Sequence, residues 1–213
     1  YLSFRNGQKA VNDMASQLRT EMMNRMEDYV RAYLKVPHQV NHVNVAAIRQ
    51  GTLDVQDFPE IEHHFWQQIQ VFDTISYLSF GNTQGEFIGI EQMREGKLHV
   101  EVKDLDVTGE DLHTYVMDDQ GERTTQRLGV VEGYDARIRP WYKAAVQAGK
   151  PTWSEIYQFS SREVVRLGTT AVQPVYDEAD QFIGVIGADI VLSQLNDFLG
   201  SLEIGQSGQS FII

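Results

Sequence analysis

The chain has 213 residues, of which 42% are apolar, so it is long enough to bury one large hydrophobic core or two small ones. Its 18 basic and 30 acidic residues give a formal net charge of −12, which repels phosphate backbones and excludes nucleic acid as an expected partner. The absence of cysteine excludes disulfide bonds, thiolate nucleophiles and cysteine-ligated zinc.

The two ends of the sequence, YLSFRNGQ and QSFII, carry neither an initiating methionine nor a polar tail. We therefore expect a piece of a longer protein. Within that piece no apolar run approaches the ~20 residues that a bilayer-spanning helix needs, so no membrane span is expected.

The N-terminal part of the chain has the pattern of a long helix. Over residues 6–34 apolar side chains recur every fourth position between arginines and glutamates, which predicts one amphipathic helix. Pro37 is expected to end this helix, because proline lacks the N–H that would continue it. Two shorter helices are expected after it, at residues 43–49 and 60–72.

The apolar period then changes to two, which is typical of strands. Strands are predicted at residues 75–81, 86–93, 97–104 and 112–118, and the short turns GNTQG, REGK and DDQG between them require antiparallel pairing. A helix at 139–148, two long strands at 164–176 and 182–192, and a last short helix complete the pattern. The fold class is therefore α+β: a long N-terminal helix followed by an antiparallel sheet flanked by helices.

No group of side chains has the spacing of a catalytic or metal-binding set. His38 and His42 are four residues apart, but no third ligand is placed to help them. The glycines of GQSGQS lack the lysine of a phosphate-binding loop, and no G-x-S-x-G nucleophile motif occurs. We expect no enzyme, no metal and no cofactor.

One segment, YDARIRPWYKAAVQAGKPTWSEIY (134–157), combines groups that suit a small charged ligand. The guanidinium of Arg139 can bind a carboxylate through two parallel hydrogen bonds, and the indole N–H of Trp141 can donate a third. The rings of Tyr134, Tyr142 and Tyr157 can provide aromatic faces for an ammonium group.

The matching anionic group would be Asp189, which interrupts the apolar strand FIGVIGADIVL. A lone carboxylate on a half-buried strand is costly unless a positive group meets it. The residues also fit a simpler interpretation, in which the aromatic side chains belong to the core, Arg139 pairs with any nearby acid and Asp189 caps the last helix.

Five motifs in order, RIRPWYKAA, TWSEIY, TTAVQPVY, GVIGADI and LEIGQSGQSFII, resemble the double Cache family of extracytoplasmic sensor domains, and the likeness covers nearly the whole chain. The resemblance implies a helix that rises from the membrane beside two stacked PAS-like modules, with the ligand in the membrane-distal one. Residues 1–45 would be the signalling helix and the following turn, 46–200 the membrane-distal module, and 201–213 the start of a truncated membrane-proximal module.

The site residues are similar to those of the amino-acid-binding subset of that family. By this resemblance Arg139 and Trp141 would hold a ligand carboxylate, whereas Tyr134, Tyr157 and Asp189 would hold its ammonium, with Tyr142 beside them. The side-chain part of the pocket is not identified, although Phe159 and the strand near Thr170 are plausible liners.

The implied protein is a non-enzymatic periplasmic sensor of an inner-membrane receptor. It would dimerise through its first helix and bind a small zwitterion, above all an amino acid. Its output beyond the membrane is left open: a kinase, cyclase, phosphatase or chemotaxis domain. The alternatives are a sensor for a small carboxylate or another amine, and a dimerisation domain without a ligand.

Overall fold

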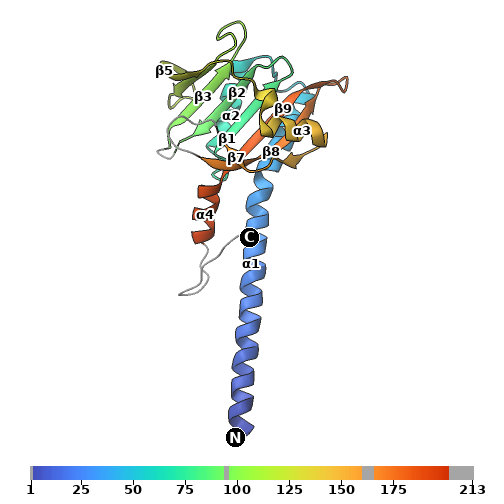
Figure 1. Cartoon of the computed structure of the whole chain (residues 1–213), viewed down its shortest axis with the longest axis vertical. Coiled ribbons are helices and arrows are strands. Elements are labelled where there is room, and N and C mark those ends of the chain that lie inside the picture. The colour runs from blue at the N-terminus through green and yellow to red at the C-terminus, as the bar shows by residue number, and fades with distance from the viewer. Residues whose placement is uncertain (1, 94–95, 160–165, 202–213) are drawn as a thin grey trace. The chain divides into compact units, whose positions relative to one another are not determined.

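The computed structural model describes residues 2–93, 96–159 and 166–201 (Figure 1). Its elements follow in the order α1 (Leu2–Arg49), α2 (Phe58–Ile69), β1 (Tyr77–Asn82), β2 (Phe87–Gln92), β3 (Leu98–Lys103), β4 (Leu112–Met117), β5 (Arg123–Val131), η1 (Ala136–Ile138), α3 (Pro140–Ala148), β6 (Thr152–Trp153), β7 (Tyr157–Gln158), β8 (Leu167–Tyr176), β9 (Phe182–Val191) and α4 (Leu192–Ser201). This is the α+β order that the sequence predicts.

The chain divides into two compact units, and the first contains α1 up to Lys35 and α4 from Asn196. In this unit the ring of Tyr33 stacks on Phe198 with centroids 4.5 Å apart. Apolar side chains of α1 are open to solvent, among them Val11 at 64% exposure, Met14 at 68% and Leu18 at 60%. Among the described residues no helix has both the length and the apolarity of a membrane span.

The second unit, Val36–Leu195, is built on one antiparallel sheet. In the described part of the chain nine strands join in the order β5-β4-β3-β2-β1-β9-β8-β6, and β7 pairs with β8. β1 thus lies between β2, its neighbour in sequence, and β9, which follows more than a hundred residues later. This long-range pairing brings the two halves of the unit together.

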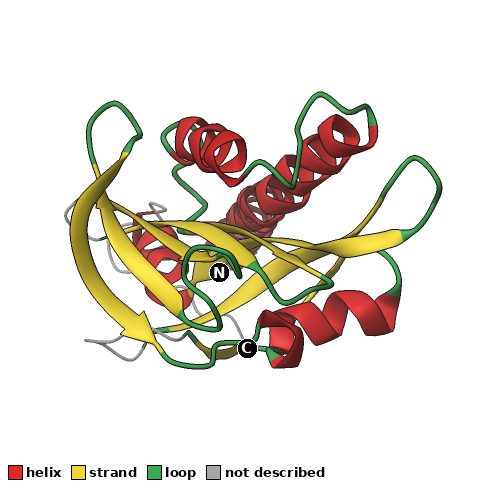
Figure 2. Ribbon diagram, turned by 90° about the horizontal axis from the view of Figure 1, so that it is seen from above, coloured by secondary structure: helices red, strands yellow, loops and turns green. Residues whose placement is uncertain are grey.

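The two faces of the sheet differ, because successive side chains of a strand alternate between them. One face packs its apolar residues, including Leu78, Ile90 and Ile186, against α2 and the end of α1. The other face carries polar side chains and a second cluster, in which Phe87 packs with Trp141 and Tyr142 of α3. Helices therefore cover both sides of the sheet (Figure 2).

The prediction that Pro37 ends the first helix is wrong. Pro37 lies inside α1, and residues 43–49 continue the same helix. An interior proline removes one hydrogen bond and costs ~3 kcal/mol. The turns that follow offset this cost because they are buried on the sheet: Val40 is 2% exposed, and Asn41 donates from Nδ2 to the carbonyl of Ala171 at 2.7 Å.

Several other boundaries differ from the prediction. α2 starts before residue 60, because Asp57 caps it by accepting from the backbone N–H of Glu60 at 3.1 Å. The sequence did not predict β5. Four consecutive residues of this strand are exposed and its pairing with β4 is irregular, so its apolar and polar residues do not alternate. The predicted module start at 201–213 lies, after Ser201, outside the described residues.

Candidate functional site

A cavity lies on the polar face of the sheet, between the strands and the segment that leads into α3. Its empty volume is about 570 Å³, which includes open solvent at its mouth. It is lined by Ser76, Tyr77, Ser79, Phe87, Glu91, Glu101, Tyr134, Arg139, Trp141, Tyr157, Phe159, Arg166 and Asp189.

Strand register explains why polar side chains meet here. Thr170, Asp189, Tyr77 and Glu91 form one row across β8, β9, β1 and β2. Residues directly opposite in paired strands point to the same face. Glu101 of β3 belongs to the next row on that face, opposite Gly89. The pleat therefore directs three carboxyl groups toward one cavity.

Arg139 and Trp141 line the cavity from the start of α3. Arg139 is the N-cap residue with an extended backbone, and Pro140 follows in the first turn. Its Nη2 reaches the carbonyl of Gln158 only at 3.5 Å, which leaves the guanidinium weakly held. Trp141 is 4% exposed and lies close over Gly187, where a Cβ would come within 3.5 Å of the indole.

Asp189 lines the cavity from β9 and is 4% exposed. Burial raises the pKa of its carboxyl to about 8, the hydrogen bond from the Thr170 side chain opposes this rise, and the charge of Glu91 adds to it. A cation that approached Asp189 would favour the ionised carboxylate, which has little contact with water in the empty site.

Two of the three predicted tyrosines line the cavity. The hydroxyl of Tyr157 shares a hydrogen bond of 2.9 Å with Oγ1 of Thr170, and burial raises its pKa. Burial also raises the pKa of Tyr134, and the negative charge of Glu101 is the next cause. Tyr142 does not line the cavity: its hydroxyl donates to the carbonyl of Asn82 at 3.4 Å.

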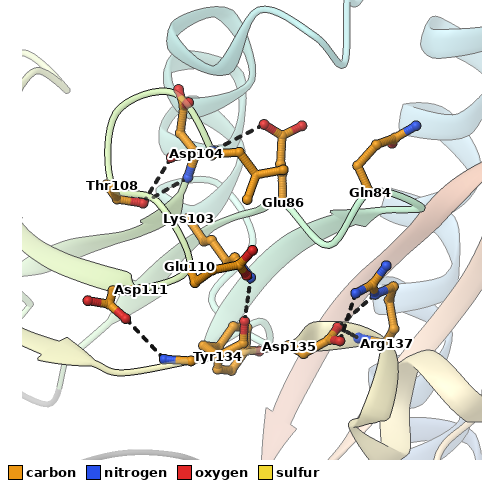
Figure 3. A network of polar contacts seen from close by, with 12 residues as sticks. Gln84, Glu86, Lys103, Asp104, Thr108, Glu110, Asp111, Tyr134, Asp135 and Arg137 are labelled. Atoms are coloured by element: carbon orange, nitrogen blue, oxygen red, sulfur yellow. Dashed lines mark hydrogen bonds and ion pairs between the residues drawn. The ribbon is translucent and has the colours of Figure 1, made fainter.

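The main chain of Tyr134 is fixed by a buried lysine. Lys103 is 2% exposed, and its Nζ donates to the carbonyl of Tyr134 at 2.8 Å and to Glu110 at 2.7 Å (Figure 3). Nearby, Asp111 accepts from the backbone N–H of Gly133 at 3.0 Å. These contacts hold the segment that carries the cavity-lining side chains of Tyr134, Arg139 and Trp141.

Sequence reasoning missed six charged or polar liners of the cavity, namely Ser76, Tyr77, Ser79, Glu91, Glu101 and Arg166. Tyr77 donates from its hydroxyl to Glu101 at 2.7 Å, and Arg166 forms an ion pair with Glu91. Burial raises the pKa of Glu91 to about 7. Like Asp189, both glutamates interrupt apolar strands, and this signal could have indicated them. The expected liner Phe159 does face the cavity.

Residues 77–197 match the family model described as methyl-accepting chemotaxis protein-like, first PDC sensor domain. The methyl-accepting chemotaxis protein McpA of Pseudomonas putida is 35% identical over 103 residues, which cover 47% of this chain and 16% of McpA. Most of that relative thus has no counterpart here.

Two solved structures show a similar fold. One, "Methyl-accepting Chemotaxis protein X", has a TM-score of 0.58 at 13% identity and covers 89% of this chain and 67% of its own. The other is the ligand-binding domain of the Campylobacter jejuni chemoreceptor Tlp3 in complex with L-valine, with a TM-score of 0.54 at 11% identity over 87% of this chain and 61% of its own.

The family match extends from β1 into α4, so it includes the described strands and nearly all of the residues that line the cavity. It confirms the resemblance to Cache-type sensors that the sequence motifs indicate. The chain belongs to the family of methyl-accepting chemotaxis protein-like sensor domains.

Proposed function

We propose that this sensor domain binds a small zwitterion, above all an L-amino acid, in the cavity between Arg139 and Asp189. The observation that carries the proposal is the position of these two side chains. They come from different elements, a helix N-cap and a strand, yet both line the same cavity. A ligand with one charge of each sign would satisfy both.

The carboxylate of the ligand would bind at the α3 end. Among the described residues Arg139 makes one long side-chain hydrogen bond, so its planar guanidinium can donate two parallel hydrogen bonds to a carboxylate. The indole N–H of Trp141 adds a donor that carries no charge.

The ammonium group would bind at the strand end, among Asp189, Tyr157 and Tyr134. The buried carboxyl of Asp189 gains most from a positive partner. The two tyrosine rings and hydroxyls provide faces and acceptors for the remaining N–H groups.

The receptor context of this site is also a proposal. McpA is a chemotaxis protein and Tlp3 is a chemoreceptor whose domain holds L-valine, which supports a role as the non-catalytic, extracytoplasmic part of a membrane receptor. The division into helix 1–45, distal module 46–200 and partial module 201–213 stays a prediction. The exposed apolar side chains of α1 at Val11, Met14 and Leu18 support a parallel homodimer through that helix.

Occupancy would reach α1 through β8. Thr170 bonds Tyr157 in the cavity, and the carbonyl of the next residue, Ala171, accepts from Asn41 of α1. A ligand that draws Arg139 toward Asp189 would favour a closed form, and only a higher affinity for that form can shift the population.

The test begins with a thermal-shift screen of the L-amino acids and short organic acids, since a ligand that binds the native state raises its Tm. Calorimetry then compares the best amino acid with its deaminated acid, for example L-valine with 3-methylbutanoate. We expect at least tenfold tighter binding of the amino acid. Equal affinities would rule out the ammonium role and favour a carboxylate sensor. No stabilisation by any compound would favour a domain without a ligand.

A further inference from the structure

The side chain of Tyr77 lies over a glycine of the neighbouring strand. Tyr77 of β1 is paired with Glu91 of β2, and Gly89 is the diagonal neighbour on the same face of the sheet. A Cβ on Gly89 would stand 2.5 Å from Oη of Tyr77, 2.7 Å from Cζ and 2.9 Å from Cε2. The phenol ring therefore occupies the space that a side chain at position 89 would fill.

The lining of the cavity reflects this arrangement. Ser79 and Glu101, which are the register partners of Gly89 in β1 and β3, both line the cavity. Gly89 stands between them on the same face but does not line it, whereas Tyr77 does. The ring of Tyr77 thus forms the floor of the cavity above Gly89.

Contacts at the hydroxyl and along the ring hold Tyr77 in this position. The hydroxyl donates to Oε2 of Glu101 at 2.7 Å, and burial raises its pKa well above the ordinary value of 10, so it stays a donor near neutral pH. The ring packs beside Phe87 with centroids 6.3 Å apart, and Phe87 in turn contacts Tyr134 at 5.3 Å and Trp141 at 6.1 Å. A ring packed in this way resists displacement by a ligand.

The side chain of a bound amino acid would extend toward this ring. Its head group would lie between Arg139 and Asp189, and beside β8 the ring of Phe159 packs edge-on against Tyr157 with centroids 5.0 Å apart. In the described part of the chain most of the remaining lining stands on β1, β2 and β3. Tyr77 is the aromatic side chain on the floor of that part of the cavity.

We propose that the ring of Tyr77, lying over Gly89, sets the length of the amino acid side chain that this sensor accepts. This inference rests on the proposed function, because it needs Arg139 and Asp189 to hold the head group. It adds a specificity-determining residue and narrows the ligand class to amino acids whose side chain ends before the ring. A longer side chain would have to displace a packed ring, and overpacking of this kind should lower affinity about tenfold or more.

Calorimetry on the 213-residue chain compares L-norvaline with L-2-aminooctanoate, whose linear apolar side chains differ only in length. Both Kd values are measured on the same variant, so a general loss of stability does not change their ratio. We expect the wild-type domain to bind norvaline at least about tenfold tighter. In Tyr77→Ala, which removes the ring, the ratio should fall below about threefold.

Three further variants separate the ring from other effects. Tyr77→Phe keeps the ring without its hydroxyl, and Tyr115→Ala removes a tyrosine that packs on the opposite face of the sheet, so both should keep the wild-type ratio. Gly89→Ala pushes the ring toward the ligand, so the affinity for L-norvaline should fall at least about threefold relative to that for L-alanine.

Equal affinity of the wild-type domain for norvaline and aminooctanoate, or an unchanged ratio in Tyr77→Ala, would overturn the proposal. A ratio lost as fully in Tyr77→Phe would also overturn it, because the hydrogen bond and not the ring would then set the limit. If Tyr77→Ala does not fold, Gly89→Ala decides: binding of norvaline and alanine in the wild-type ratio would overturn the assignment. These outcomes contradict this inference alone, whereas wild-type binding of no amino acid would contradict the proposed function as well.

Discussion

The protonation of Asp189 should make ligand binding depend on pH. Burial holds the pKa of this carboxyl at about 8, so near neutral pH the empty site holds it mainly as the neutral acid. An ammonium ligand needs the carboxylate. Binding should therefore release a proton, and the apparent affinity should rise with pH.

The size of the effect follows from the ionised fraction. A carboxyl with a pKa of about 8 is ionised about one time in a hundred at pH 6 and about one time in ten at pH 7. The apparent Kd is the intrinsic Kd divided by the competent fraction. We expect the Kd for an amino acid to fall about tenfold from pH 6 to pH 7, and to level off above pH 8.

The stability of the empty domain should change in the opposite direction. The folded-state pKa of Asp189 is raised above the ordinary value of 3.8, so between about pH 4 and pH 8 the folded state binds more protons than the unfolded state. This group therefore destabilises the fold progressively as pH rises through that window. The Tm of the empty wild-type domain should fall more between pH 5 and pH 8 than that of Asp189→Asn, which cannot titrate.

Calorimetry at pH 6, 7 and 8, in buffers of different ionisation enthalpy, measures both the Kd and the protons released. We expect close to one proton released at pH 7. A Kd that stays constant from pH 6 to pH 8, or a pH dependence of the same size in Asp189→Asn, would refute the role assigned to this carboxyl.

Three further changes test the site and its link to α1. Arg139→Lys keeps the charge but loses the planar guanidinium, so calorimetry should show amino acid affinity reduced about 10- to 100-fold. The Tm of the empty domain should stay within about 1 °C, because Arg139 makes one long side-chain hydrogen bond to the described part of the chain. An equal loss of affinity in the exposed control Arg127→Lys would contradict this reasoning. Gly187→Ala places a methyl group 2.9 Å from Cγ2 of Thr170 and 3.1 Å from Oγ of Ser79. Urea unfolding should show about 1–3 kcal/mol of lost stability, and calorimetry should show weaker amino acid binding. Unchanged stability and affinity would show that the cavity floor is not closely packed. Asn41→Ala removes the donor to the carbonyl of Ala171, so the free energy of unfolding in urea should fall by about 1–3 kcal/mol. Amino acid affinity should change less than threefold, and a large loss of affinity would place Asn41 in the binding site itself.

Much of the fold can be predicted from local patterns. The alternation in 75–81, 86–93, 97–104 and 112–118 and the short turns between them correctly predict the first four strands. Pro37 shows the limit of this reasoning, because burial of the following turns on the sheet outweighs the local cost of proline. β5 shows another, since its exposed side chains give no periodic signal.

The candidate site could be predicted only in part, for a similar reason. Arg139 and Asp189 stand out by their chemistry, and Glu101 also interrupts an apolar strand. That Glu101 and Asp189 meet at one cavity follows only from the strand register, which includes the long-range pairing of β1 with β9. Tyr142 follows Trp141 in the same helix, where successive residues point about 100° apart. Trp141 lines the cavity, whereas Tyr142 packs beside it in the same apolar cluster, and the sequence alone does not distinguish the two.

A crystal structure of the domain with its tightest-binding amino acid tests the account most directly. We expect the ligand carboxylate within about 3 Å of the Arg139 guanidinium, and its α-ammonium at a similar distance from the Asp189 carboxylate. Ligand density with these two ends reversed, or bound away from both side chains, would contradict the account.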